Sequence, residues 1–225
     1  MLFFAKEDGY AVLTTAGYIA CAVLVLLIVV SAALLFKPKG TVKPHWRAKK
    51  LVFSAVSLAL AFVLSYIQPY KLPWGGSVTL FSMLFICLIG NWYGLRTGLT
   101  VAFTYSILQF IQSGGSYILT PLQVCCDYFF AFTALGFSGA FSGKKHGLIK
   151  GYLLGIFLRG LFHTIGGYLY WMEYMPDNFP KSLTAVYPIV YNYSYILIEG
   201  AATLLVLCIP AVKSALNRIK QMTAE

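Results

Sequence analysis

Acidic residues are scarce in this chain, and charged residues of either sign are few. Its 225 residues include seven Asp and Glu against seventeen Lys and Arg, and 11% of the chain is charged whereas 59% is hydrophobic. So low a charged fraction excludes an ordinary soluble domain and is typical of a polytopic membrane protein. The basic excess does not predict nucleic-acid binding, because the basic residues lie between apolar runs rather than on one soluble face.

Paired cysteines and nucleotide-binding loops are also lacking. All five cysteines fall inside apolar runs, without paired spacing in polar loops: Cys21, Cys87, Cys125, Cys126 and Cys208. This placement indicates neither a disulfide framework nor a metal site such as zinc. No Gly-x-x-x-x-Gly-Lys-Ser/Thr loop is present, so the chain cannot hydrolyse ATP by that route, and active transport would need energy from partners.

Long apolar runs dominate what is present. A helix needs about 20 residues to cross the hydrocarbon core of a bilayer, and seven runs approach or exceed this length. They cover about 11–36, 51–68, 78–93, 99–112, 121–141, 151–171 and 185–212. The first run lacks the basic start and small-residue cleavage site of a signal peptide, so we expect it to be retained. The sequence therefore predicts an all-α integral membrane protein.

The basic residues predict the orientation of these spans. Thirteen of the seventeen lie in alternate connecting segments, three lie in the other segments (Lys6, Lys71 and Lys181), and Arg159 lies within a span. Because basic loops stay on the cytoplasmic side, seven spans with the N-terminus outside and the C-terminus inside are expected. We divide the chain into residues 1–46, an extra N-terminal span with a basic cytoplasmic loop, and residues 47–225, a membrane domain.

Asp127 stands out because it lies in the middle of an otherwise apolar run. A carboxylate within a membrane span costs about 2.5 to 3.5 kcal/mol, so it normally faces a cavity or a partner and indicates a functional site. Arg159 and Glu199 are the other charged residues in apolar runs, and we expect them to pair with each other. That pairing would leave Asp127 to balance a bound organic cation.

Other polar and aromatic residues are expected at the depth of Asp127. On the sixth span, Arg159, His163, Gly167 and Trp171 recur every four residues and so share one helix face. Tyrosine and tryptophan faces attract cations by about 0.5 to 2 kcal/mol each once water is excluded. Besides Asp127, the residues expected near a ligand are Tyr128, His163, Trp171, Tyr187, Asn192, Tyr117 and Trp74.

Less specific explanations remain open for these residues. Aromatic residues near span ends are usually interfacial belts, and a single histidine such as His163 can be a satisfied interior residue. An intramembrane hydrolase could use Cys125 or Cys126 as nucleophile with His163 as base, although no third orienting residue stands out. A purely structural subunit would not explain why acid, histidine, amide and rings coincide in depth.

The order and spacing of several short motifs resemble one family, the thiamine-specific substrate-binding (S) components of energy-coupling factor (ECF) transporters, called ThiT. The resemblance covers roughly residues 47–212. It is carried by LPWGGSV at 72–78, YILTPLQ at 117–123, DYFFAF at 127–132 and LGFSG at 135–139, followed by Arg159, His163, Gly166, Gly167, Trp171, Tyr187 and Asn192. Two departures are the aspartate at 127, where family members often carry glutamate, and the extra span before the usual six.

This resemblance implies a six-helix, vitamin-binding subunit of the cell membrane that is not an enzyme and needs no cofactor. Its pocket would lie near the outer face and bind thiamine, with Asp127 as countercharge, Trp171 stacking and Asn192 hydrogen-bonding. Trp74 would close over the ligand from a loop. Its partners would be a transmembrane coupling subunit and two ATPases, met through the small residues Ala55 and Ala59. The alternative is an uptake subunit for another vitamin or organic cation.

Overall fold

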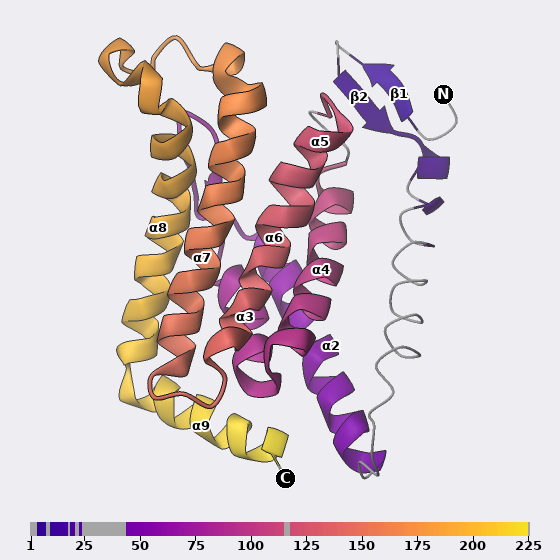
Figure 1. Ribbon diagram of the computed structural model, residues 1–225, viewed down its shortest axis with the longest axis vertical. Helices are drawn as coiled ribbons and strands as arrows, with labels where there is room; N and C mark the ends of the chain where they lie inside the picture. Colours follow the sequence, from indigo (N-terminus) through magenta and orange to yellow (C-terminus); the bar gives the residue numbers. More distant parts are fainter. Residues whose placement is uncertain are drawn as a thin grey trace.

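The chain folds as a bundle of helices that lie roughly parallel to one another (Figure 1). The computed structural model describes residues 4–7, 10–17, 19–20, 23, 44–114 and 118–224. Within these residues, six helical segments make the bundle. They are α2 (Pro44–Tyr66), α3 (Ser82–Tyr93), α4 (Leu95–Gln112), a composite segment from Pro121 to Phe141, α7 (Gly147–Gly166) with its continuation to Tyr174, and α8 (Tyr187–Cys208).

Two of these segments change helix type along their length. The composite segment consists of α5 (Pro121–Val124), a π-helical turn (Cys125–Phe130), α6 (Ala131–Thr133) and a 3-10 stretch (Ala134–Phe141). After α7 come a second π-helical turn (Gly167–Trp171) and a 3-10 turn (Met172–Tyr174), and a 3-10 stretch (Lys181–Val186) leads into α8. Both π-helical turns therefore lie toward the same end of the bundle, on neighbouring segments.

Short elements flank the bundle. An antiparallel hairpin of β1 (Phe4–Glu7) and β2 (Tyr10–Leu13) lies near the N-terminus, and a smaller one of β3 (Tyr70–Lys71) and β4 (Ser77–Val78) connects α2 to α3. The final helix α9 (Pro210–Ala224) crosses the bundle at the end where α8 finishes (Figure 1). The β3–β4 hairpin and α9 thus mark opposite ends of the molecule.

The helical, membrane-type fold is confirmed, whereas three predicted span boundaries are wrong. Four described helices are long and apolar enough to cross a membrane. The run 78–93 is not one continuous span, because α3 has 12 residues and rises about 18 Å. It is preceded by β4 and by a bend at residues 80–81, where Phe81 is in the left-handed conformation. The run 185–212 stops at Cys208, since Ile209 precedes Pro210 and adopts an extended conformation that proline favours in the residue before it.

The first apolar run also departs from a helix at its start. We predicted a span from residue 11, but β2 includes residues 11–13 and pairs with β1. Most of the remainder of the run 11–36 lies outside the described residues. The division of the chain at residue 46 thus stays a prediction.

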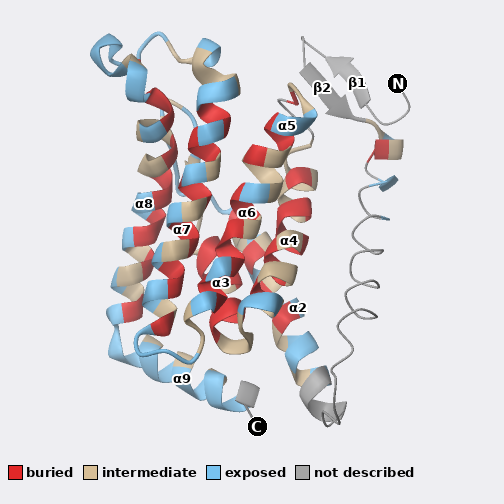
Figure 2. Cartoon of the chain, in the orientation of Figure 1, coloured by how far each residue is buried: buried red, intermediate tan, exposed pale blue. Residues whose placement is uncertain are grey.

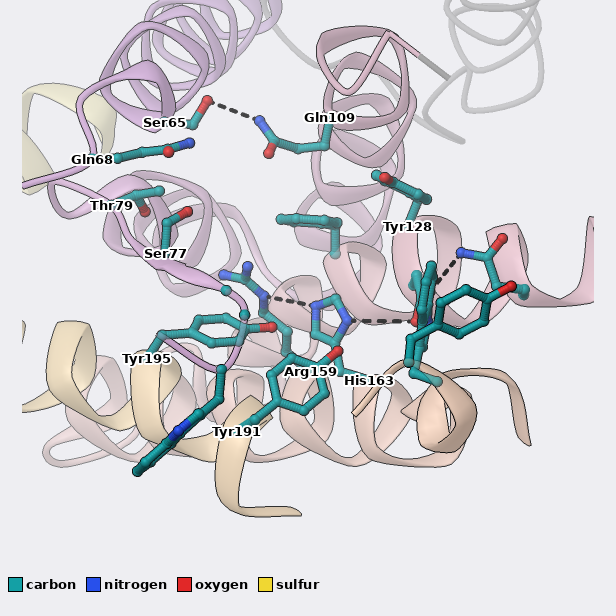
Figure 3. A pocket seen from close by; sticks show the side chains of 18 of the residues that line it. Ser65, Gln68, Ser77, Thr79, Gln109, Tyr128, Arg159, His163, Tyr191 and Tyr195 are labelled. Carbon is teal, nitrogen blue, oxygen red and sulfur yellow. Dashed lines mark hydrogen bonds and ion pairs between the residues drawn. The ribbon is translucent and has the colours of Figure 1, made fainter. Parts of the chain in front are cut away.

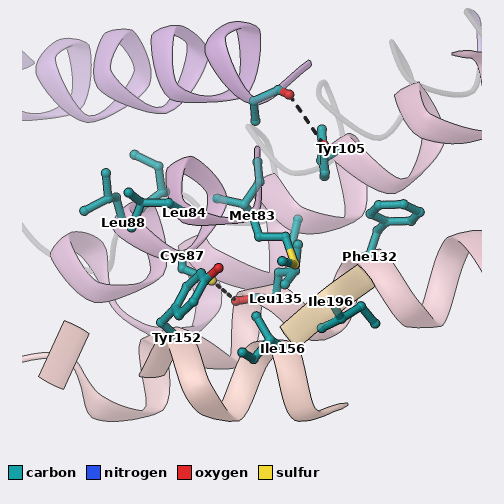
Figure 4. Close-up of a cluster of buried hydrophobic side chains, with 14 of the residues drawn as sticks. Met83, Leu84, Cys87, Leu88, Tyr105, Phe132, Leu135, Tyr152, Ile156 and Ile196 are labelled. Carbon is teal, nitrogen blue, oxygen red and sulfur yellow. Dashed lines mark hydrogen bonds between the residues drawn. The ribbon is translucent and has the colours of Figure 1, made fainter. Parts of the chain in front are cut away.

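The core lies where α3, α4 and the 3-10 stretch of residues 134–141 meet. Met83, Cys87 and Leu135 are fully buried there (Figure 4), and so is Ile86. Figure 2 shows that buried residues gather on the sides of the helices that face one another. Backbones touch directly: a Cβ added to Gly98 would lie 2.6 Å from the carbonyl oxygen of Gly136. In a bilayer, where the hydrophobic effect does not drive helices together, close packing of small residues stabilises their association.

Glu199 joins α8 to the start of α3. Its carboxylate accepts hydrogen bonds from the Thr79 amide at 3.2 Å, the Thr79 hydroxyl at 2.6 Å and the Met83 amide at 3.2 Å. Phe81, which precedes α3, makes no side-chain cap of its own. Glu199 therefore satisfies the Met83 amide, which α3 leaves open in its first turn, and the Thr79 amide just before the helix. A negative charge at this end is also favoured by the helix dipole.

Candidate functional site

A cavity of about 500 Å³ opens between the helices at the end opposite α9, within the size range of small-molecule sites. Figure 3 shows its lining. The lining residues come from every helical segment except α3, from the β3–β4 hairpin and from the chain after it. They are Ser65, Gln68, Trp74, Gly75, Gly76, Ser77, Thr79, Gln109, Gln112, Gln123, Asp127, Tyr128, Phe132, Arg159, His163, Trp171, Tyr174, Pro176, Tyr187, Tyr191 and Tyr195. Among these described residues, Asp127 is the one carboxylate.

Asp127 reaches the cavity from the first π-helical turn. One carboxylate oxygen, Oδ2, accepts a hydrogen bond from Gln123 Nε2 at 2.6 Å and another from Trp171 Nε1 at 2.7 Å. The other, Oδ1, lies 3.9 Å from His163 Nδ1. Gly166 leaves room for the carboxylate, since a Cβ there would be 2.5 Å from Oδ1. Three neighbours thus fix the orientation of the anion while 13% of its side chain stays exposed.

The local sequence explains why this segment begins where it does. Pro121 occupies the first turn of α5, and the Thr120 hydroxyl accepts a hydrogen bond from the Gln123 amide at 3.1 Å. This is a normal helix start, with a capping hydroxyl followed by proline. The predicted start of the fifth span near Pro121 is confirmed.

The helix face predicted on the sixth span does bring its polar members to the cavity. Arg159, His163 and Trp171 all line it, and Arg159 Nε donates to His163 Nε2 at 3.5 Å. Gly167 instead faces α8, where a Cβ would meet the Pro188 side chain at 2.7 Å. The second π-helical turn, which runs from Gly167 to Trp171, carries Trp171 to Asp127.

The predicted ion pair between Arg159 and Glu199 is wrong. In the part of the chain that the structure describes, no carboxylate lies within 4 Å of the Arg159 guanidinium. Glu199 is occupied by Thr79 and Met83, as described above. Arg159 instead lies over the Phe132 ring at 4.4 Å.

Aromatic rings cover the α8 side of the cavity. Tyr187 stacks on Tyr191 with centroids 5.1 Å apart, and Tyr191 contacts Tyr195 at 6.4 Å. These residues recur every four positions and therefore share a face of α8. The Tyr128 ring, from the opposite segment, packs edge-on against Phe110 at 5.4 Å. The cavity walls thus present ring faces and edges from two sides.

The β3–β4 hairpin covers the cavity as a lid. Trp74 at its tip packs edge-on against Phe179 at 5.2 Å, and the Tyr187 hydroxyl donates to the Trp74 carbonyl at 3.2 Å. Gly76, with φ of 79°, lies directly against the Tyr195 ring, and a side chain there would overlap the ring. Two loops, 70–78 and 175–186, therefore meet over the rings of α8.

Two of the predicted ligand residues are not placed in the lining. Asn192 is fully buried; its amide donates to the carbonyls of Pro188 at 2.8 Å and His163 at 3.2 Å, and its oxygen accepts from the Tyr195 hydroxyl at 3.2 Å. These bonds tie α8 to α7 and position Tyr195. Tyr117 lies outside the described residues.

Sequence reasoning missed a group of uncharged polar residues at the far side of the cavity from Asp127. Gln109 Nε2 donates to Ser65 Oγ at 2.9 Å and to Gln112 Oε1 at 2.7 Å, and Gln68 and Ser77 lie beside them. The available signal was their spacing, because glutamine and serine recur three residues apart at the ends of both α2 and α4. Single polar residues near span ends are common, so this spacing alone predicts little.

The cysteines beside Asp127 do not form a catalytic site. Neither Cys125 nor Cys126 lines the cavity, and His163 is directed at Arg159 and Asp127 instead. Among the described residues, no cluster of three His, Cys, Asp or Glu side chains is placed to hold a metal ion. The geometry therefore favours binding over chemistry.

A helical membrane bundle with a ring-lined cavity and a single acidic group defines a membrane component that holds a small organic ligand. The sequence model of the thiamine transporter protein family (Thia_YuaJ) matches residues 51–218. The chain belongs to this family. Family members are transport components rather than enzymes, and the chain is accordingly a multi-pass membrane protein.

Individual relatives agree with this assignment. The chain is 28% identical to the thiamine transporter ThiT of Bacillus subtilis over 175 residues, which cover 71% of this chain and 88% of the relative. It is 25% identical to ThiT of Lacticaseibacillus paracasei over 177 residues, covering 72% and 86% respectively. The solved structure of ThiT from Listeria monocytogenes has the same fold, with a TM-score of 0.55 at 23% identity over 74% of this chain and 97% of that one.

Proposed function

We propose that this chain captures thiamine in the cavity and passes it inward as the substrate-binding subunit of an ECF-type importer. The observation that carries the proposal is Asp127, a carboxylate held in a ring-lined cavity without an Arg or Lys partner among the described residues. Thiamine is a flat organic cation, so it supplies both the missing positive charge and the aromatic surface. The names of the relatives, thiamine transporters, support the same ligand.

Each part of thiamine has a complement in the cavity. Its positively charged thiazolium ring suits the faces of Trp171 and Tyr128 beside Asp127, where exclusion of water strengthens cation–π attraction. Its aminopyrimidine ring carries donors and acceptors that His163 and Asp127 can match. Closure of Trp74 and Tyr187 over the ligand would exclude water, and opening of the lid would weaken the same interactions.

We assign the cavity to the outer face and α9 to the cytoplasmic face. The basic residues support this orientation, because they gather at the end away from the cavity. Examples are Lys144 and Lys145 in the turn before α7, and Lys213 and Arg218 on α9. Seven spans, with the extra one formed by residues 1–46, complete the proposed topology. Ligand would thus enter from outside and leave on the α9 side.

The outer face of α2 is the proposed contact with the transmembrane coupling subunit, which would work with two ATPases. Ala55 and Ala59 are exposed there, whereas Ser54 and Ser57 on the same helix are buried. Small residues four apart allow another helix to approach closely. An Ala59→Leu change would then reduce thiamine uptake in cells and leave binding by the purified chain unchanged.

Binding by the purified full chain tests the proposal directly. Thiamine quenching of tryptophan fluorescence should saturate, because Trp74 and Trp171 line the cavity. Asp127→Asn should weaken affinity by well over tenfold, since a desolvated ion pair and its hydrogen bonds are lost. Asp177→Asn, which alters an exposed loop carboxylate, is the matched control.

Two outcomes would count against the proposal. Unchanged affinity in Asp127→Asn would remove that carboxylate from the mechanism. If wild-type protein fails to bind thiamine but binds another organic cation or vitamin in a competition panel, the ligand assignment is wrong while the transport class remains.

A further inference from the structure

The final helix α9 has an apolar face bordered by basic residues. Val212, Leu216 and Ile219 share one face, because they follow one another at intervals of four and three residues. All three are half-buried, and Leu216 packs against the hydrophobic core. Lys213 and Arg218 are exposed, and at about 100° per residue they lie on opposite borders of this face. Such an arrangement is typical of a helix that lies on a membrane surface.

The chain bends where α9 begins, so this helix does not continue the direction of α8. Ile209 is extended, Pro210 opens α9, and the Lys213 amide donates to the Ile209 carbonyl at 3.0 Å. The helix then crosses the end of the bundle (Figure 1) and packs against α8 and α2. Because the long apolar helices of the bundle cross the bilayer, α9 lies roughly in the plane of one membrane surface.

The apolar surface next to α9 continues the lipid-facing side of α8. Leu205 is 71% exposed near the end of α8, and Ile209 at the bend is 46% exposed. Met222, toward the other end of α9, is 54% exposed. A bilayer covers these side chains together with the rest of α8. A soluble protein partner would cover the polar face of α9 but would not reach the side of α8 within the membrane.

Charge at this end of the bundle is of one sign. Other elements contribute basic residues here, namely Lys49, Lys50, Arg96, Lys144 and Lys145. The sequence of α9 and the segments 94–98 and 142–150 contain no Asp or Glu. In the described part of the chain, no carboxylate lies within 4 Å of Lys213 or Arg218. The complement of such a surface is a layer of negative charge, and each basic residue near an anionic membrane strengthens binding by about fivefold.

We infer that α9 is an interfacial anchor that binds the headgroups of anionic phospholipids in the inner leaflet. The apolar face of α9 and the bend at Ile209 lie at the boundary between headgroups and acyl chains. Lys213 and Arg218 extend from the two borders of that face to lipid phosphates. The inference rests on the proposed orientation, with α9 at the cytoplasmic face, and is independent of the ligand that the cavity binds.

Lipid selectivity of the purified full chain in neutral detergent tests the anchor. Apparent affinities are measured from the rise in melting temperature on titration with dioleoylphosphatidylglycerol and with dioleoylphosphatidylcholine. These lipids share acyl chains, but only the first has a net negative headgroup, so wild-type protein should prefer it. The double change Lys213→Gln with Arg218→Gln should reduce this preference by about tenfold or more.

The matched control removes two positive charges from the opposite end of the molecule. Lys71 and Lys181 are exposed there, and Lys71→Gln with Lys181→Gln should keep the wild-type preference. A second control, Lys213→Arg with Arg218→Lys, retains both charges on α9 and should also keep it. High salt should weaken the preference of wild-type protein, because exposed charges are screened.

Three outcomes would overturn the anchor. The first is an unchanged preference after Lys213→Gln with Arg218→Gln, and the second is a loss of preference in the charge-retaining variant. The third is wild-type protein that does not distinguish the two lipids, as expected if this surface meets an acidic protein instead. Glycerol 1-phosphate, a headgroup without acyl chains, should not raise the melting temperature; a rise equal to that with the lipid would indicate a site for soluble anions and contradict the anchor.

Thiamine affinity of the same preparations separates this inference from the proposed function. The α9 variants should bind thiamine as wild type does, since neither Lys213 nor Arg218 lines the cavity. Wild-type protein that prefers the anionic lipid but does not bind thiamine would overturn the proposed function and leave the anchor in place. The reverse result, thiamine binding without lipid preference, would overturn the anchor alone.

Discussion

The half of the bundle built from α3, α4 and residues 134–141 contrasts with the half built from α7, α8 and the lid. In the first half glycines bring backbones into contact, as at Gly98 and Gly136. In the second, the rings of Tyr187, Tyr191 and Tyr195 on α8 line the opening instead. The two halves thus differ in their main contribution, although Gln109 and Gln112 of α4 also line the cavity. The first half mainly supplies packing, and the second supplies most of the aromatic rings that a ligand can contact.

The largest effect should follow from filling the close contact in the packed half. In Gly136→Val, the added side chain would meet the backbone of Leu99, 2.6 Å from an added Cβ. Overpacking without room to relax should cost about 3 kcal/mol or more and lower the melting temperature by about 10 °C in detergent. Ala140→Val, at an exposed position of the same stretch, should melt as wild type; equal melting of both variants would show that this half is not tightly packed.

Glu199→Gln should have the next largest effect, again on stability. The amide retains the shape of the side chain but loses the charge that accepts hydrogen bonds from Thr79 and the Met83 amide. A loss of about 1.5 to 3 kcal/mol is expected, measured as a lower melting temperature. Glu173→Gln, in an exposed 3-10 turn, is the control, and a similar small shift in both would argue that Glu199 does not hold α3.

Trp171→Phe should affect affinity and leave stability alone. A smaller aromatic ring remains, but the indole hydrogen bond to Asp127 at 2.7 Å is lost, so thiamine should bind about five- to tenfold more weakly. Trp92→Phe, in which Trp92 packs edge-on against Phe53 in the other half, should bind normally. A melting temperature that falls in Trp171→Phe without a change in affinity would break the proposed division between the two halves.

The smallest effect is expected from Tyr187→Phe, which removes one lid contact. Its hydroxyl donates to the Trp74 carbonyl at 3.2 Å, and losing about 1 kcal/mol there should speed thiamine dissociation by about fivefold. Stopped-flow displacement measures this rate. Tyr168→Phe loses a hydroxyl that bonds the Ala185 carbonyl away from the cavity, and its dissociation rate should match wild type. Equal rates in both variants would show that the lid does not depend on this bond.

The sequence predicted those parts of the fold that depend on local signals. Pro121 after Thr120 marks a helix start because both act within one turn, and the structure begins α5 there. The extent of the run 78–93 could not be predicted in this way. Its apolar composition is the same whether the chain is helical or extended, and the short α3 is stabilised by Glu199, which lies more than a hundred residues away.

The site divides in the same manner. Asp127 was identifiable because an acid in an apolar run is costly. The four-residue spacing on the sixth span then put His163 and Trp171 on one helix face, at a depth similar to that of Asp127. The polar group around Gln109 carries no charge and so gave no comparable signal. The predicted pairing of Arg159 with Glu199 failed because the sequence shows opposite charges on neighbouring helices but not their other hydrogen-bond partners. The Glu199 carboxylate already accepts hydrogen bonds from Thr79 and the Met83 amide.

The π-helical turn at Cys125–Phe130 makes the length of this segment as important as its composition. Such a turn contains one residue more than an α-helical turn. Asp127 and Tyr128 lie inside this wide turn, so deleting one residue from it would restore α-helical winding and change the direction in which these two side chains point. The number of residues between Thr120 and Ala131 therefore constrains the cavity as much as their identity does.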